Sequence, residues 1–161
     1  MADLIKSGYG QIELNRCSFL HDGNIESQCE ATEDIENGAI VVVDKAAKTV
    51  RNAKVADFTA DGVLLGVSYT TEKIYNQFTP GRKHFRTEKG AYPRVGYFKA
   101  GDVFSTNVML TADNFAAIEA GQYWKGETTV EAGVPAKGPK LLVAEVTDTA
   151  DGQDALKIQV L

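Results

Sequence analysis

Short runs of branched apolar residues, each preceded by a glycine-containing turn, are the feature that most constrains the fold of this chain. An Asn-Gly pair leads directly into the apolar run 39–43, and an aspartate ends it. The same order of turn and apolar run recurs at 60–69 and 100–107. Apolar runs of this length between turn residues predict strands, and Asn-Gly suits the positive φ angles of a tight turn. The chain is therefore expected to be mainly β.

Further strand patterns follow along the chain. In 155–161, Leu156, Ile158 and Val160 alternate with polar residues and are expected to share one buried face. Gly66 lies inside another pattern, where a glycine indicates a bulge or a sharp corner. The segments in which we expect strands are 12–20, 39–43, 49–53, 62–70, 94–110 (two strands), 140–146 and 155–161.

One helix is predicted over 111–121, with Thr111 as its N-cap and Gly121 as its C-cap. Many short strands with a single helix favour a small β-barrel or sandwich over alternating β–α units. We therefore expect one mainly β domain over 12–161, with a long middle loop near 71–94. An extended N-terminal arm over 1–11 precedes it.

Length and composition predict an ordinary soluble domain. The chain has 161 residues, of which 43% are hydrophobic and 24% charged, so it is long enough to bury a core without metals or disulfides. Its net charge of −5 argues against a duplex nucleic-acid binder, which needs a dense basic surface. We find no apolar stretch long enough for a signal peptide or a membrane helix, so synthesis in a cytoplasm is expected.

The sequence contains no known catalytic motif. Glu33, Asp34 and Glu36 lie together at 31–38, but the segment has no apolar surroundings that raise a pKa, and it indicates a solvated turn rather than an acid–base pair. His21 and His84 are far apart and predict neither a general base nor a metal site, which needs three or four ligands. No cofactor is expected.

The two cysteines, Cys17 and Cys29, are expected to be reduced because no secretion signal is visible. If 12–20 paired with 25–30 as a hairpin, the two thiols would come close, so a disulfide is the alternative.

Two segments carry the residue types of a partner-binding surface. The N-terminal arm is apolar but has poor periodicity, so it is either an added strand on a neighbour or a frayed terminus. The stretch 81–90 is the one strong local excess of positive charge, and it is a solvated hairpin tip, a protein contact or a site for single-stranded nucleic acid. The candidate partner-binding residues are Leu4, Ile5, Tyr9, Arg82, Lys83, Phe85 and Arg86.

The order of these pieces resembles that of the capsid decoration, or cement, proteins of tailed bacteriophages. The resemblance rests on an arm of the type SGYGQIELN, on the strand patterns ENGAIVVVDKAAKTV, GVLLGVSY and GDVFSTN, on TADNFAAIEAGQY and on the closing hairpin LLVAEVTDTADGQDALKIQVL. It covers most of the chain as an arrangement, and its motifs have low specificity because glycine turns and short strands occur in any barrel.

The resemblance implies a non-enzymatic, barrel-like or β-tulip-like structural protein on the outside of the virion. Such a protein binds the major capsid protein and clamps neighbouring capsomers. It also implies self-association, with a trimer among the allowed states, and no contact with membrane or nucleic acid. In the family an arm reaches to adjacent subunits, and here the arm is MADLIKSGYG.

Two other readings of the residues stay open. The first is an OB-like module that binds single-stranded nucleic acid or carbohydrate through the aromatic and basic stretch. The second is a small enzyme whose site combines scattered carboxylates with His84.

Overall fold

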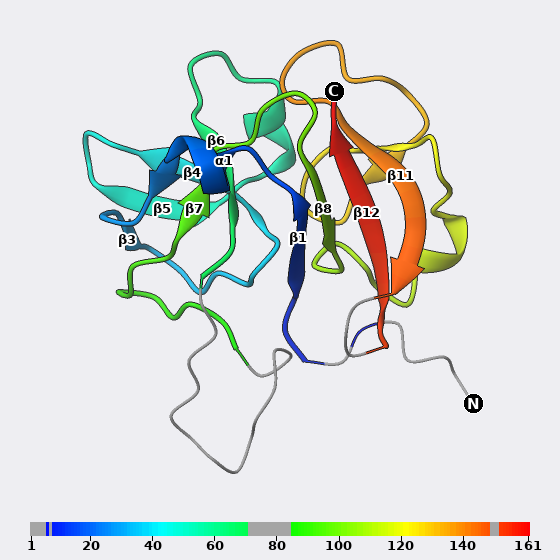
Figure 1. Ribbon diagram of the computed structural model, residues 1–161, viewed down its shortest axis with the longest axis horizontal. Helices are drawn as coiled ribbons and strands as arrows, with labels where there is room; N and C mark the ends of the chain where they lie inside the picture. The colour runs from blue at the N-terminus through cyan, green and yellow to red at the C-terminus, as the bar shows by residue number, and fades with distance from the viewer. Residues whose placement is uncertain (1–5, 7, 71–84, 149–151) are drawn as a thin grey trace.

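The computed structural model of the protein describes residues 6, 8–70, 85–148 and 152–161, and these residues form two six-stranded sheets (Figure 1). Sheet 1 has the strand order β1 (Ile12–Arg16), β8 (Val103–Thr106), β12 (Asp154–Val160), β11 (Leu141–Asp148), β9 (Tyr123–Trp124) and β10 (Val130–Glu131). Sheet 2 has the order β2 (Ile25–Glu26), β7 (Val95–Gly96), β6 (Leu65–Ser68), β4 (Ile40–Asp44), β5 (Thr49–Asn52) and β3 (Glu30–Ala31).

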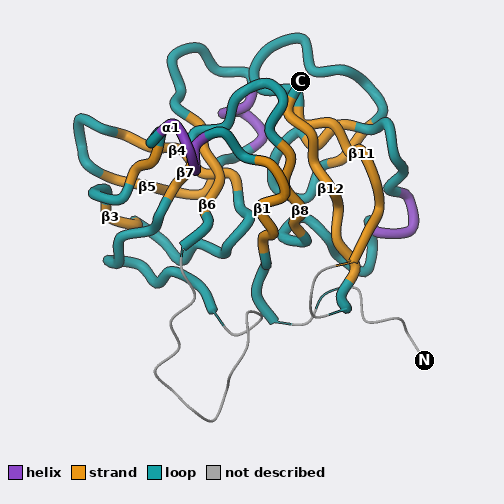
Figure 2. The backbone as a smooth tube through the Cα atoms, in the orientation of Figure 1, coloured by secondary structure: helices purple, strands orange, loops and turns teal. Residues whose placement is uncertain are grey.

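The mainly β fold class with a single short α-helix is confirmed. All described strand pairs are antiparallel except β3 with β5. Within the described residues the two sheets do not close into a barrel, because each keeps two edge strands. Helices occupy only short stretches between long loops (Figure 2). Among these residues, none of the helices is long and apolar enough to cross a membrane.

The helix lies in a different place from the one predicted. The α-helix α1 is Phe19–Asp22, whereas the segment 111–121 contains only the 3₁₀ turn η3 (Phe115–Ala117). The prediction of a longer helix there was wrong because the backbone becomes extended at Ile118, whose side chain is buried. The backbone of 121–122 then pairs with Val143, through hydrogen bonds of 2.8 Å each way. Thr111 still caps a turn, since its Oγ1 accepts from Asn114 N at 3.2 Å.

One hydrophobic core joins the two sheets. In β12 the predicted alternation is confirmed, since Leu156, Ile158 and Val160 are buried and the residues between them are half-buried. A second, smaller cluster lies within sheet 2 around Ile35 and Val41. The largest fully buried side chains of the main core are Phe19, Phe104, Met109, Leu110, Trp124, Leu141, Leu156 and Ile158.

Gly66 lies within β6, but it marks neither a bulge nor a corner. The β6–β7 register is regular, and a Cβ on Gly66 would lie 2.5 Å from Val95 Cγ1 and 2.8 Å from Gly96 O. The glycine is therefore needed for the close approach of β7. The bulges of the fold lie in β1, between Leu14 and Arg16, and in β11.

Cys17 and Cys29 are both free and buried. The hairpin that would bring them together does not form, because β1 pairs with β8 and β2 pairs with β7. Burial, and after it the charge of Asp102, raises the pKa of Cys17 to about 12. Burial, followed by Glu26, also raises the pKa of Cys29. Neither thiol has the lowered pKa of a reactive cysteine.

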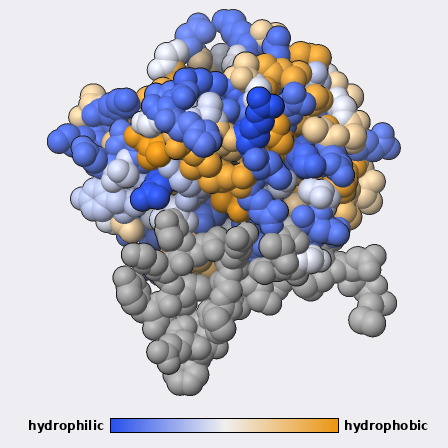
Figure 3. Space-filling model, viewed as in Figure 1, coloured by the Kyte–Doolittle hydropathy of each residue, from blue (hydrophilic) through white to orange (hydrophobic). Residues whose placement is uncertain are grey.

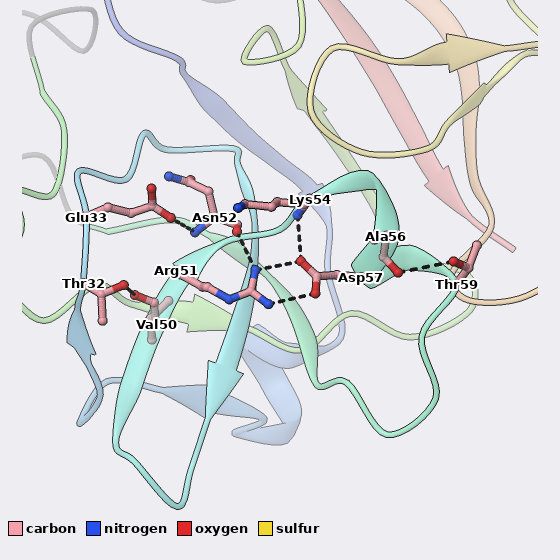
Figure 4. Close-up of polar contacts among 9 residues, drawn as sticks. All are labelled: Thr32, Glu33, Val50, Arg51, Asn52, Lys54, Ala56, Asp57 and Thr59. Carbon is pink, nitrogen blue, oxygen red and sulfur yellow. Dashed lines mark hydrogen bonds and ion pairs between the residues drawn. The ribbon is translucent and has the colours of Figure 1, made fainter.

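An ion pair closes the connection between β5 and the 3₁₀ helix η1 (Val55–Phe58). The Arg51 guanidinium faces both carboxylate oxygens of Asp57, at 2.7 and 2.8 Å, and Asp57 also accepts from Lys54 N at 2.8 Å (Figure 4). These contacts, led by the hydrogen bonds from Arg51, hold the pKa of Asp57 below its ordinary value of 3.8. The two-point geometry makes this pair more specific than a single surface contact.

Asp57→Asn is expected to lower the free energy of unfolding by about 1 kcal/mol at neutral pH. The pKa of Asp57 is lower in the folded chain than in the unfolded chain. Its contribution is therefore fully present above about pH 4 and is lost as the pH falls through the folded pKa. Urea unfolding of both proteins should show a difference that shrinks at about pH 3. A difference of the same size at both pH values would mean that packing, and not charge, is lost in the variant.

Candidate interaction surface

Asp34 and Glu36, here called the acidic anchor, hold two separate segments against the body. The Asp34 carboxylate accepts from Lys89 N at 2.9 Å and pairs with Arg86 Nη1 at 2.9 Å. Glu36 Oε2 accepts from Gly10 N at 2.6 Å and lies 3.6 Å from Lys6 Nζ. Glu33 and Asp34 are exposed and Glu36 is half-buried, so the segment is solvated as expected. In addition, Asp34 and Glu36 bind two segments that are distant in the sequence, which was not predicted.

A backbone bridge reinforces the contact with the segment 85–90. Ile35 and Thr87 exchange two hydrogen bonds of 2.8 Å each, and the Ile35 side chain is fully buried. The neighbouring Glu33 accepts from Asn52 N at 2.9 Å, so the segment is also tied to β5 (Figure 4). This network leaves none of the three carboxylates of 33–36 as an isolated acid or base.

The arm and the basic stretch meet at Tyr9 and Arg86. The Arg86 guanidinium carbon lies 4.8 Å from the centroid of the Tyr9 ring, which is the geometry of a cation–π contact. Arg86 therefore touches Tyr9 on one side and Asp34 on the other. Tyr9, Phe85 and Arg86 are all half-buried. Of the predicted partner-binding residues, these three are brought to one place.

The other predicted residues, Leu4, Ile5, Arg82 and Lys83, lie outside the described residues, as does His84. His21 is exposed on α1. The described part of the arm, Lys6 and 8–11, lies against the body through the contacts with Glu36 and through a hydrogen bond from Lys6 Nζ to Val108 O at 3.3 Å.

Buried polar residues next to the ends of strands make further contacts between distant segments, and these contacts were not predicted. Gln11 N donates to Asn107 Oδ1 at 2.8 Å, and Asn37 Nδ2 donates to Thr70 O at 2.9 Å. Gly38 N donates to Ser68 O at 2.7 Å. The only sequence signal for this arrangement was the Asn-Gly pair at 37–38, since side-chain contacts between distant segments leave no local pattern.

A groove of about 260 Å³ lies next to the acidic anchor. Its apolar lining includes Ile40, Ala53 and Trp124, and Asp34 and Glu36 also line it. The Trp124 indole donates to the Glu127 carbonyl at 2.9 Å. Throughout the part of the chain that the structure describes, no three His, Cys, Asp or Glu side chains are grouped so that they would hold a metal ion.

Aromatic and cationic residues continue along the segment held by the acidic anchor. Lys89 is exposed, and the Tyr92 side chain is 59% exposed. We define the Tyr9–Arg86 surface by the residues Tyr9, Phe85, Arg86 and Lys89. No family model, curated protein or solved structure matches this chain.

Proposed function

We propose that the protein is a structural protein of a tailed-bacteriophage virion, which binds the outer surface of the head and stabilises it by clamping neighbouring capsomers. The observation that carries this proposal is the contact between Tyr9 and Arg86. Two segments with partner-binding composition, far apart in the sequence, meet there as one surface on a β-rich body.

The composition of the Tyr9–Arg86 surface supports a protein partner. Tyrosine, phenylalanine and arginine are enriched at protein interfaces, where a few of them carry most of the binding free energy. The acidic anchor fixes Arg86 before binding, so less side-chain entropy is lost on association. When many copies bind to one capsid lattice, their individually modest contacts together give strong binding.

The proposed partner is the major capsid protein, and neighbouring copies of the chain are the second partner. The alternative of an OB-like module needs a five-stranded, partly open barrel. The described residues instead form two open six-stranded sheets, which argues against this alternative.

The test is co-sedimentation of the purified protein with heads assembled from the major capsid protein that is encoded with it. We expect saturable binding, and Arg86→Ala should weaken it about tenfold, because a central interface arginine is lost. Lys137→Ala is the matched control, since Lys137 is an exposed cation on a different loop and should leave binding unchanged.

Thermal melts of Arg86→Ala should show a body that is still folded. Absence of any binding to the heads would contradict the proposed function. Binding that is equal for wild type and Arg86→Ala would contradict the assignment of the Tyr9–Arg86 surface but leave a virion role in place.

A further inference from the structure

A second groove, here called the β1 groove, lies at the end of β1 that is remote from Tyr9. It has a volume of about 400 Å³, and the turn between β7 and β8 and the helix α1 form its walls. On the face shown in Figure 3, apolar residues lie exposed among hydrophilic ones near the middle of the body. The groove residues that matter here are Leu14, Arg16, Cys17, Leu20, His21 and Asp102.

The groove lies at an open edge of sheet 1. Among the described residues β1 is the end strand of that sheet, and its one partner strand there is β8. Asn15 and Arg16 are exposed along this edge. An unpaired edge strand offers backbone donors and acceptors to another extended segment. The bulge between Leu14 and Arg16 limits such pairing to a few residues.

The side chains at this edge offer one aliphatic contact and one free positive charge. Leu20 is 46% exposed, and Leu14 is half-buried beside it in the same groove. The Arg16 side chain has no hydrogen bond or ion pair with any residue that the structure describes, although its backbone lies in the β1–β8 ladder. The nearby Lys99, by contrast, is paired with Asp22 at 2.7 Å.

The carboxylate in the groove does not neutralise Arg16. Asp102 is buried, and its oxygens accept from Ser18 N at 2.8 Å, Ser18 Oγ at 3.1 Å and Lys99 N at 2.8 Å. The groove therefore presents the aliphatic side chains of Leu14 and Leu20, an exposed strand edge and an unpaired cation. This combination favours a partner segment that carries a negative charge.

We propose that the β1 groove binds an extended segment of a partner protein, which adds a short strand to β1. The segment carries a carboxylate that pairs with Arg16, next to a large aliphatic residue that packs between Leu14 and Leu20. This site is independent of the Tyr9–Arg86 surface, because it lies at the other end of β1. It goes beyond the proposed function, since it gives the body a second contact.

The test uses the isolated full-length chain and two synthetic peptides, acetyl-TVDLTV-amide and its lysine counterpart acetyl-TVKLTV-amide. Peptide binding is followed by amide chemical shifts. We expect the acidic peptide to shift resonances of 14–18 and 20 and to bind about tenfold more tightly than the lysine peptide. Arg16→Glu should reverse this preference, which a loss of folding cannot produce.

Two further variants sharpen the test. Leu20→Ser removes an exposed aliphatic side chain, so the variant should stay folded and bind the acidic peptide about fivefold more weakly. Lys137→Glu makes the same kind of charge reversal at a remote position and should leave binding unchanged. Equal affinity of wild type and Arg16→Glu for the acidic peptide, or shifts centred on other residues, would overturn the proposal.

The other candidate occupant of the β1 groove is a second copy of the chain. Concentration-dependent dimerisation in ultracentrifugation, with shifts at 14–18 in the absence of peptide, would overturn the assignment of a different partner. Because no capsid is used, these outcomes are separate from the failure of the head-binding experiment.

Discussion

Gly38→Ala is expected to destabilise the protein by about 3 kcal/mol or more, because it combines backbone strain with a clash between the sheets. Gly38 has φ of +84°, which favours glycine. A Cβ at this position would collide with Thr106 Oγ1 and lie 2.8 Å from Gln11 O. Thr106 is in β8, so the clash would push sheet 1 away from the turn that begins β4.

Gly62→Ala is the matched control for this prediction. Gly62 has a similar φ of +74°, but a Cβ there would meet no heavy atom within 4 Å. The decrease in the free energy of unfolding of Gly62→Ala should come from backbone strain alone and amount to about 1 kcal/mol. Urea unfolding of both variants measures the difference, and Thr106→Ala in the Gly38→Ala background should recover part of it. Equal losses for the two glycines would contradict close packing between the sheets at Gly38.

Asp102→Ala is expected to lower the free energy of unfolding by about 3 kcal/mol. The buried carboxylate accepts three hydrogen bonds that join the start of α1 to the turn before β8. Without it, the donors of Ser18 and Lys99 lose a charged acceptor in a poorly hydrated place. Denaturant unfolding at neutral pH measures this loss.

Asp102→Asn is the conservative comparison, since it keeps the volume and one carbonyl acceptor. About half of the loss is expected. In both variants the pKa of Cys17 should fall below that of wild type, because the Asp102 charge is its second cause after burial. If a thiol titration gave the same pKa of Cys17 in wild type and in both variants, Asp102 would lie too far from Cys17 to affect it.

The sequence predicted the longer strands because their signal is local, but it missed the two-residue strands β3, β9 and β10, and the strand expected over 12–20 ends at Arg16 before helix α1. The apolar run at 39–43 corresponds to β4, and the alternation at 155–161 corresponds to β12. The pairing of these strands was not predictable, since it depends on contacts between distant residues. The helix at 111–121 failed for the same reason: the local pattern was helical, but pairing of 121–122 with β11 and burial of Ile118 were more favourable.

The candidate surface was predictable in composition but not in geometry. Tyr9 and Arg86 were each selected for their chemistry, and only the fold brings them within 4.8 Å. The part missed was the acidic anchor, because Asp34 and Glu36 in a polar segment look like any solvated turn. Arg16 was missed as well, since nothing in its local sequence indicates that it is left unpaired at a strand edge.

The strand order of sheet 1 has a consequence for how the chain reaches this fold. β1, β8 and β12 are neighbours, so residues 12, 106 and 156 must come together across most of the chain. Sheet 2, by contrast, uses only strands between residues 25 and 96. Closing long loops costs entropy before any contact is gained, and chains rich in distant pairings fold slowly. Refolding is therefore expected to begin in sheet 2 and to be limited in rate by the docking of β12 between β8 and β11.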